Sequence, residues 1–310
     1  MHKLVSFLAL IYITVSSVAQ AIPFSYELLP GEIYYLEFSM IQQTETEQSA
    51  AQGDASLDLR ARVIMEIMDV DSSGAYAISC FYQKPELGFF SPQSRIAISS
   101  QDKAFGKFKN YLSVLDSNPF RIKISPQGEL LEIYKLDSII KTLFIQDNFD
   151  PGKDDFFVKT IDESFGEKAF RSLSNIVLNV YDEKSDKQGR KESFVTFNAA
   201  QIAITNNFYY TTLEDEKLRI QGVGVIHETI DSVEHEDFSL VNMTKGKQTY
   251  DFLFDASSGW IIDGMSKQKI QSLGVVRKHA TLPEGLKIPS YTDTEYQFKG
   301  GRYEKEGKKK

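Results

Sequence analysis

Apolar side chains fall at every second position along much of the chain. The pattern is clearest over 57–67, where apolar and polar residues alternate and only Ile64 breaks the alternation. The turn residues Asp71-Ser72-Ser73-Gly74 follow, and the apolar run Ala75–Tyr82 comes next. Alternation with one wet face is typical of antiparallel sheets. This segment therefore predicts a β-hairpin with its turn at 71–74.

The same alternation recurs before and after this hairpin. Turns are expected at Pro30-Gly31, Pro126-Gln127-Gly128 and Asp255–Gly259, where glycine or proline breaks the pattern. Further strands are predicted over 34–40, 120–124, 130–134, 193–205, 209–213, 218–230, 238–243, 250–254, 260–264 and 267–276. We therefore expect a chain that is rich in β-structure.

Three segments instead carry apolar residues three or four positions apart. They are 105–115, 136–144 and 165–180. In the second of them, Leu136, Ile139, Ile140, Leu143 and Phe144 form a single apolar stripe, which is typical of an amphipathic helix. A charged stretch follows the third segment over 182–192 and is the best internal boundary.

The order of strands, then helices, then strands predicts an α+β fold. We expect a twisted antiparallel β-sheet, open and half-barrel-like, with two or three helices packed against it. The expected organisation is a single β-rich domain over 22–300, with N-terminal strands in 22–134, a helical segment in 135–181 and C-terminal strands in 192–300. The polar stretch 42–54 is expected to be an insert or an exposed loop.

The two ends of the chain differ from the rest. A short basic start precedes an apolar run over 4–18, and Ala19-Gln20-Ala21 fits the small-x-small pattern of a cleavage site. We therefore expect a signal peptide at 1–21, cleavage near Ala21, and a soluble protein in the periplasm or outside the cell. The basic segment 301–310 is expected to be a disordered tail.

Composition argues against some partners. The formal net charge is −8 at pH 7, which disfavours nucleic acid. No apolar run after the signal peptide reaches the ~18 residues of a membrane-spanning helix, so no transmembrane segment is expected. The single cysteine, Cys80, lies in an apolar run and is interpreted as a small buried side chain rather than as a nucleophile.

Two motifs resemble metal sites. His227-Glu228 and His235-Glu236 are too far apart for the H-E-x-x-H spacing of zinc proteases, so paired surface residues are favoured over a metal site. Asp69–Gly74 imitates the start of a calcium loop, but its twelfth position is Cys80 instead of glutamate. A plain hairpin turn is the preferred interpretation.

The remaining motifs are equally incomplete. Ser266 and Ser100 each begin an S-x-x-K match, but no K-T-G follows Ser266. Gly222-Val223-Gly224 lies inside a predicted strand, where a bulge or tight packing explains it better than a nucleotide-binding loop. We therefore assign no catalytic residue, no metal ligand, no cofactor and no specific ligand-binding residue. A pair of carboxylates for glycoside hydrolysis stays open, because acidic residues are plentiful.

Aromatic residues are the most suggestive part of the composition. The 22 Phe and 15 Tyr lie mainly on alternating strand positions. One interpretation is that they fill a large core. The other is that some of them line an apolar cavity on a curved sheet, which is the usual form of a small-ligand site. Trp260 alternates with Ile262 directly after a turn and is expected in the core.

Several turns carry a resemblance to known families. The relevant segments are Leu28–Leu36 with its Pro30-Gly31 turn, Asn118–Ile133 with its Pro126-Gln127-Gly128 turn, and Tyr250–Trp260. In these the chain resembles secreted β-rich families of unknown function from Gram-negative envelopes. Those families are similar to the open half-barrel of lipoprotein carriers. The resemblance implies a bent antiparallel sheet that covers helices and holds acyl chains, and it implies no functional residue.

Three hypotheses of function follow. The first is an exported, non-catalytic binding or carrier module for an apolar or amphipathic ligand such as a lipid. The second is a structural or protein-interaction component of the cell envelope, which would meet its partner through sheet edges or the 42–54 stretch. The third is a carboxylate-based hydrolase, so the sequence leaves enzymatic activity uncertain.

Overall fold

The computed structural model describes residues 25–46, 55–91, 94–99, 106–145, 155–181, 187–197, 200–213, 215–234, 239–277 and 285–303. The predicted signal peptide and residues 304–310 of the predicted tail lie outside these residues, as do His235, Ser100 and 47–54. No helix in the described part of the chain is long and apolar enough to cross a membrane.

The strands form one 12-stranded antiparallel sheet. They are β1 (Ile33–Thr46), β2 (Ala55–Val70), β3 (Tyr76–Ser91), β4 (Ser94–Ser99), β5 (Phe120–Ile124), β6 (Leu130–Tyr134), β7 (Gln188–Phe197), β8 (Ala200–Leu213), β9 (Lys217–Glu234), β10 (Ser239–Asp255), β11 (Ile261–Arg277) and β12 (Leu286–Arg302). Their order is β6-β5-β3-β2-β1-β12-β11-β10-β9-β8-β7, and β4 pairs with β3. The first and last strands of the chain thus meet at the centre of the sheet.

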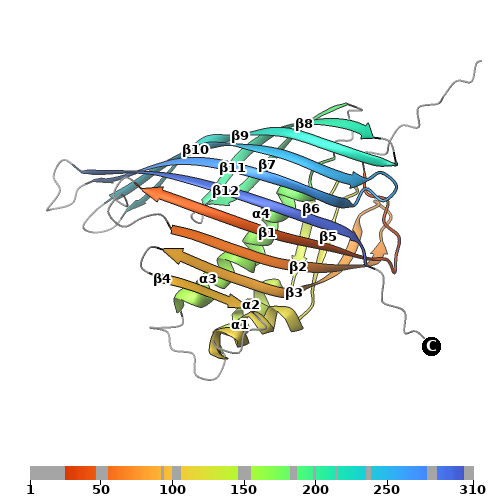
Figure 1. Cartoon of the computed structure of the whole chain (residues 1–310), viewed down its shortest axis with the longest axis horizontal. Coiled ribbons are helices and arrows are strands. Elements are labelled where there is room, and N and C mark those ends of the chain that lie inside the picture. The colour runs from red at the N-terminus through yellow and green to blue at the C-terminus, as the bar shows by residue number, and fades with distance from the viewer. Residues whose placement is uncertain are drawn as a thin grey trace, which may run out of the picture.

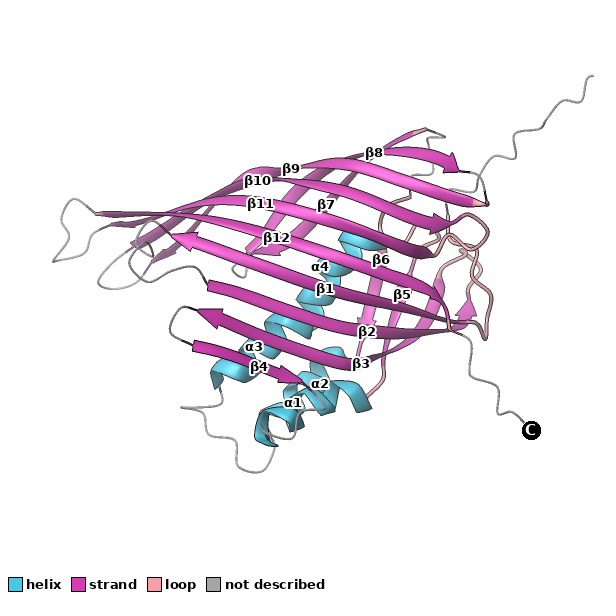
Figure 2. Cartoon of the chain, viewed as in Figure 1, coloured by secondary structure: helices cyan, strands magenta, loops and turns pink. Residues whose placement is uncertain are grey.

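Four helices lie on the inner side of the curved sheet (Figures 1 and 2). They are α1 (Gly106–Ser117), α2 (Leu136–Leu143), α3 (Asp155–Phe165) and α4 (Glu167–Val177). α1 packs on β3, whereas α4 contacts both β6 and β7, the two edge strands. The sheet is therefore open in its strand pairing, and α4 lies between its edges.

The main core fills the inner side of the sheet at the end where the turns 71–74, 126–128 and 255–259 lie. We call this end the turn end. Trp260 is 1% exposed, its ring centroid lies 4.8 Å from that of Tyr34, and its Nε1 donates to the Tyr35 carbonyl at 3.0 Å. Tyr26 packs edge-on against Tyr181 at 5.2 Å. The predicted interpretations of Trp260 and Cys80 as buried residues are confirmed.

The predicted fold class is confirmed, and several element bounds are corrected. The helix predicted over 165–180 is α4, which begins directly after Gly166, and α3 precedes it without a predicted counterpart. A Cβ at Gly166 would clash with the carbonyl and the carboxylate of Asp162. The strand predicted over 193–205 is the end of β7 and the start of β8, and the predicted insert 42–54 begins with the last residues of β1.

The longest strands were predicted in pieces. Residues 239–243 and 250–254 belong to β10, and 261–264 and 267–276 belong to β11. β4 and β12 had no predicted bounds. The predicted turns at 71–74 and 255–259 both join strands as expected.

Candidate functional site

The inner face of the sheet changes character along its central strands. On β1, the inward side chains over 34–40 are apolar and buried, whereas those of Gln42 and Thr44 are polar. β10 makes the same change between Tyr250 and Gln248. The strands continue beyond Gln42 and Gln248, away from the turn end, and we call this far end the strand end. The inner face there is lined by different side chains from those of the packed core.

A row of mostly polar residues crosses the inner face at this level, and each is the cross-strand neighbour of the next. We call this row the polar belt. From β1 to β7 it consists of Gln42, Thr294, Gln268, Gln248, Gly224, Asn206 and Lys191. A Cβ at position 224 would clash with the Asn206 side chain. The predicted explanation of the glycine pair by tight packing is therefore confirmed here.

Hydrogen bonds hold three amide side chains of the polar belt. Gln268 Nε2 donates to Gln248 Oε1 at 2.6 Å, and Asn206 Oδ1 accepts from the Tyr250 hydroxyl at 2.7 Å. Asn206 Nδ2 donates to Ser193 Oγ at 3.0 Å. Gln248 is 1% exposed and Asn206 1% exposed, and buried amides of this kind are costly unless they are paired.

Two buried polar atoms at this level lack a hydrogen-bond partner among the described residues. They are Gln248 Nε2 and Ser266 Oγ. Ser266 faces inward beside Tyr250 and Tyr296 in the row that precedes the belt. Lys269, the lysine of the motif, points to the outer face and pairs with Asp293 at 2.9 Å. The S-x-x-K match at Ser266 therefore forms no catalytic pair.

Beyond the belt, the inner face encloses a cavity of about 270 Å³, which we call the strand-end cavity. Its apolar lining residues are Ile202, Leu240 and Ile288, and the others are mostly short polar residues in place of the rings of the core. They include Thr44, Thr229, Asn242, Thr244, Ser272 and Ser290. Thr244 Oγ1 and Ser272 Oγ lie 3.1 Å apart. For comparison, an apolar cavity of about 150 Å³ is large enough to hold benzene.

A second hollow lies between the sheet and the helices α3 and α4. This helix-side groove has a volume of about 480 Å³. Its sheet wall is apolar and includes Phe38, Met40, Leu59 and Tyr296, and Gln42 of the polar belt lies at its end. On β1, Gln42 lines the groove, and the next inward residue, Thr44, lines the strand-end cavity. The two hollows thus adjoin, and we call them together the chamber.

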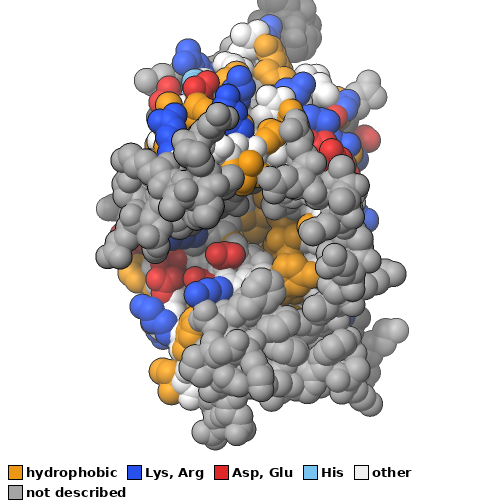
Figure 3. All heavy atoms as spheres, turned by 90° about the vertical axis from the view of Figure 1, so that its left-hand side faces the viewer, with side chains coloured by type: hydrophobic (Ala, Val, Ile, Leu, Met, Phe, Trp, Pro, Cys, Tyr) orange, Lys and Arg blue, Asp and Glu red, His pale blue; other side chains and the backbone are white. Residues whose placement is uncertain are grey.

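The chamber faces the side of the molecule where the long strands end. Figure 3 shows that this side is hollowed, with hydrophobic side chains deep inside and charged side chains at the rim. The charged lining residues of the described chain are Asp162, Glu163 and Lys168 in the groove and Asp231 in the cavity. Burial raises the pKa of Asp162 above its ordinary value, and the negative charge of Asp137 adds to this effect.

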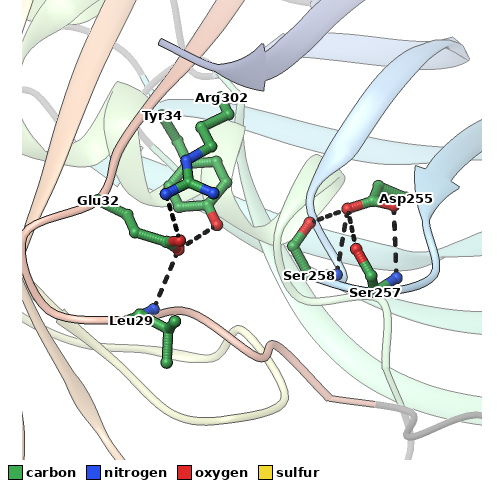
Figure 4. Close-up of polar contacts among 7 residues, drawn as sticks. All are labelled: Leu29, Glu32, Tyr34, Asp255, Ser257, Ser258 and Arg302. Atoms are coloured by element: carbon green, nitrogen blue, oxygen red, sulfur yellow. Dashed lines mark hydrogen bonds and ion pairs between the residues drawn. The ribbon is translucent and has the colours of Figure 1, made fainter. Parts of the chain in front are cut away.

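A third hollow, of about 270 Å³, lies at the opposite, turn end of the sheet and includes Glu32 and Asp255. Figure 4 shows that each carboxylate is directed at its own neighbours. Glu32 accepts from the Tyr34 hydroxyl at 2.6 Å and pairs with Arg302 at 2.8 Å. Asp255 accepts from the hydroxyl and the backbone N–H of Ser258. Both acids therefore hold local structure.

Asp255 shows how strongly this turn holds a charge. Burial alone would raise the pKa of Asp255, but hydrogen bonds from Ser258 and Ser257 outweigh it and hold that pKa below its ordinary value. The carboxylate is thus adapted to remain ionised while it fixes the turn between β10 and β11.

The other motifs of the sequence occupy structural positions. His227 Nε2 lies 2.7 Å from Thr205 Oγ1, and His235 lies outside the described residues. Asp71 accepts from the Ser73 backbone at 2.8 Å and pairs with Lys123 at 2.8 Å, so the predicted hairpin turn at 71–74 is confirmed. In the part of the chain that the structure describes, no three His, Cys, Asp or Glu residues come together as a metal site.

Sequence comparison identifies the family. Residues 73–261 match a family of unknown function, DUF6263, and the chain belongs to it. The match covers the helices and four of the chamber strands, β3, β8, β9 and β10, and stops at the start of β11. No curated protein matches the chain.

Solved structures offer only distant likenesses. DynF, from the dynemicin biosynthesis pathway of Micromonospora chersina, is 7% identical at a TM-score of 0.23, over 90% of this chain and 85% of that one. OccK7 of Pseudomonas aeruginosa is 6% identical at a TM-score of 0.25, over 88% of this chain and 100% of that one. An outer membrane channel of Pseudomonas putida F1 is 6% identical at a TM-score of 0.22, over 89% of this chain and 98% of that one. At these scores neither fold nor function transfers to this chain.

Proposed function

We propose that this protein is a non-catalytic binding or carrier module that holds an amphipathic ligand in the chamber. The proposal includes export by a signal peptide at 1–21, a single domain over 22–300 and a basic tail at 301–310. It also includes the Gram-negative envelope setting and the likeness to the open half-barrel of lipoprotein carriers.

One observation carries this proposal. The strands extend past the packed core, and many of their inward side chains at the strand ends are short and polar, beside the apolar Ile202, Leu240 and Ile288. The inner face is therefore hollow there instead of filled. The groove volume falls within the ~300–1,000 Å³ that is usual for ligand pockets. An apolar wall beside a polar one suits a ligand with an apolar tail and a polar head.

A dye-binding experiment tests the proposal. The purified chain is titrated with N-phenyl-1-naphthylamine, an uncharged apolar dye, after lipid extraction. Thr44→Trp fills the strand-end cavity and Ala169→Phe fills the groove. Each variant should weaken dye binding by about tenfold, because the added side chain occupies the space of the ligand.

Gln43→Trp is the matched control. Gln43 neighbours Thr44 on β1 but is exposed on the outer face, so this variant should bind the dye like the wild type. Circular dichroism and thermal unfolding confirm that each variant is folded. If folded wild-type protein binds no dye, or if all three variants bind it equally well, the proposal is wrong.

A role in protein interaction in the envelope is the second candidate. Its support is an apolar area on the outer face of β8 and β9, where Tyr209, Val223 and Val225 are 50%, 50% and 52% exposed. Exposed apolar patches often mark interaction sites. Val223→Lys should then abolish capture of a specific envelope protein without changing dye binding. Equal capture by wild type and variant would exclude this role for the patch.

A further inference from the structure

The two walls of the chamber define the chemistry of the ligand they can hold. This inference rests on the proposed function. The strand-end cavity offers threonine and serine hydroxyls together with the amide of Asn242. Each hydroxyl can both donate and accept, and the amide does so with separate atoms. Such a wall can satisfy a head group that carries several hydroxyls of its own.

The charges around the chamber oppose an anionic head group. Asp231 lines the strand-end cavity, and Asp162 and Glu163 line the groove, against one lysine, Lys168, among the described lining residues. An anionic head in the strand-end cavity would lose its hydration and would face the negative charge of Asp231 directly, with the groove carboxylates adding to the negative potential. A neutral hydroxylated head meets neither cost, because its hydrogen bonds with water are replaced by hydrogen bonds with the wall.

The groove provides the place for the tail. Phe38, Met40 and Leu59 form an apolar wall that continues from the main core, and Leu173 of α4 faces them. The junction between groove and cavity lies between Gln42 and Thr44 on β1. A single ligand can therefore place an alkyl chain against the apolar wall of the groove and its head in the strand-end cavity.

We infer that the ligand is an uncharged lipid with a polyhydroxylated head, such as a glycosyl or glyceryl lipid, whose tail lies in the groove and whose head lies in the strand-end cavity.

Chain-matched amphiphiles test this inference on the full-length protein. Dodecyl β-glucoside, dodecyl phosphate and dodecyltrimethylammonium share one tail and differ in the head. Each is used below its micelle concentration to displace the bound dye. Dodecyl β-glucoside should bind about tenfold more tightly than dodecyl phosphate. It should also bind more tightly than the cation, because a trimethylammonium head is attracted by the carboxylates but can make no hydrogen bond with the hydroxyl wall.

Two substitutions separate the head contacts from the tail contacts. Thr244→Val removes a hydroxyl from the cavity while keeping the shape of the side chain, so it should weaken glucoside binding about threefold or more relative to any change in dye binding. Asp231→Asn should raise the affinity for dodecyl phosphate more than the affinity for the glucoside. Asp263→Asn on the outer face is the charge control.

The possible results distinguish this inference from the function on which it rests. If dodecyl phosphate or the cation binds as tightly as the glucoside, the head-group inference fails while the binding function stands. It also fails if Thr244→Val and Asp231→Asn leave every affinity unchanged. If the wild type binds neither the dye nor any of the three amphiphiles, the proposed function itself fails.

Discussion

The two ends of the sheet use the same strands for opposite purposes. At the turn end, inward rings such as Trp260, Tyr34 and Phe252 pack closely and are almost fully buried. At the strand end, inward residues such as Thr244 and Ser272 surround an empty volume of about 270 Å³. Strand pairing continues through both ends, and β10 with β11 is in register from Ser239 to Leu253.

This contrast shows that backbone pairing and core packing are separable in a large sheet. The ladder hydrogen bonds do not depend on side-chain size, so strands can extend beyond the residues that fill the core. The packed end should then account for most of the free energy of folding, and the hollow end should tolerate change in its walls. The predictions below test this division, beginning with the largest effect.

Trp260→Ala should cost the most stability. Removal of the indole leaves a cavity between Tyr34 and Tyr26 and a Tyr35 carbonyl without its donor. The expected loss is about 3–5 kcal/mol of unfolding free energy, measured by urea denaturation. Thr292→Ala in the hollow half should cost less than about 1.5 kcal/mol. Comparable losses at the two sites would contradict the division.

Glycine substitutions give a second comparison. Gly128 has φ +83°, and a Cβ there would clash with the Leu178 carbonyl, so Gly128→Ala should cost at least ~2 kcal/mol. Gly274 lines the strand-end cavity, and its nearest neighbour would be Asn242 Oδ1 at 3.3 Å. Gly274→Ala should stay within about 1 kcal/mol of the wild type. Thermal unfolding of both variants measures these two changes in stability.

The same division explains which features could be predicted from the sequence. Around 57–67 and 34–40 the inward residues are apolar and the outward ones polar, so alternation revealed both the strands and the buried face. In β12, Ser290, Thr292 and Thr294 face inward, and Asp293 and Glu295 next to them face outward. Both faces are polar there, so no alternation marks the strand.

The chamber was missed for that reason. Its walls lie where the inward side chains stop being apolar, and their polarity makes a strand resemble a loop in the sequence. The question whether the aromatic residues fill the core or line a cavity has a divided answer, since Phe252 is 1% exposed in the core whereas Phe38 and Tyr296 line the groove. Only the register of the strands brings the polar belt together.

The polar belt offers a test at the border between the two ends. Tyr250→Phe leaves Asn206 Oδ1 without its donor in a buried site, which should cost about 1–3 kcal/mol. Ser266→Ala removes a buried hydroxyl that has no partner in the described structure, so stability should stay unchanged or rise by about 1 kcal/mol. Chemical denaturation measures both. A large loss for Ser266→Ala would show that the hydroxyl has a bonding role.

The smallest expected effects are on the pH dependence of stability. Asp255 at the turn end and Asp162 in the groove should change the stability with pH in opposite directions. At the packed end, the pKa of Asp255 in the folded chain lies below its ordinary value. The folded state therefore releases this proton more readily than the unfolded chain does. Its contribution to stability is present above pH ~4 and is lost as the pH falls through the lowered pKa. Asp255→Asn should flatten the loss of stability on the acidic side.

At the groove, burial raises the pKa of Asp162 in the folded chain, and the charge of Asp137 raises it further. The folded state then holds the proton longer than the unfolded chain does, so stability falls as the pH rises from ~4 through the raised pKa. Asp162→Asn should remove this fall. Urea midpoints of both variants between about pH 3 and 7 provide the measurement. Slopes of the same sign for Asp255 and Asp162 would show that the groove carboxylate is solvated like a surface group and that the hollow end is more open to water than its walls indicate.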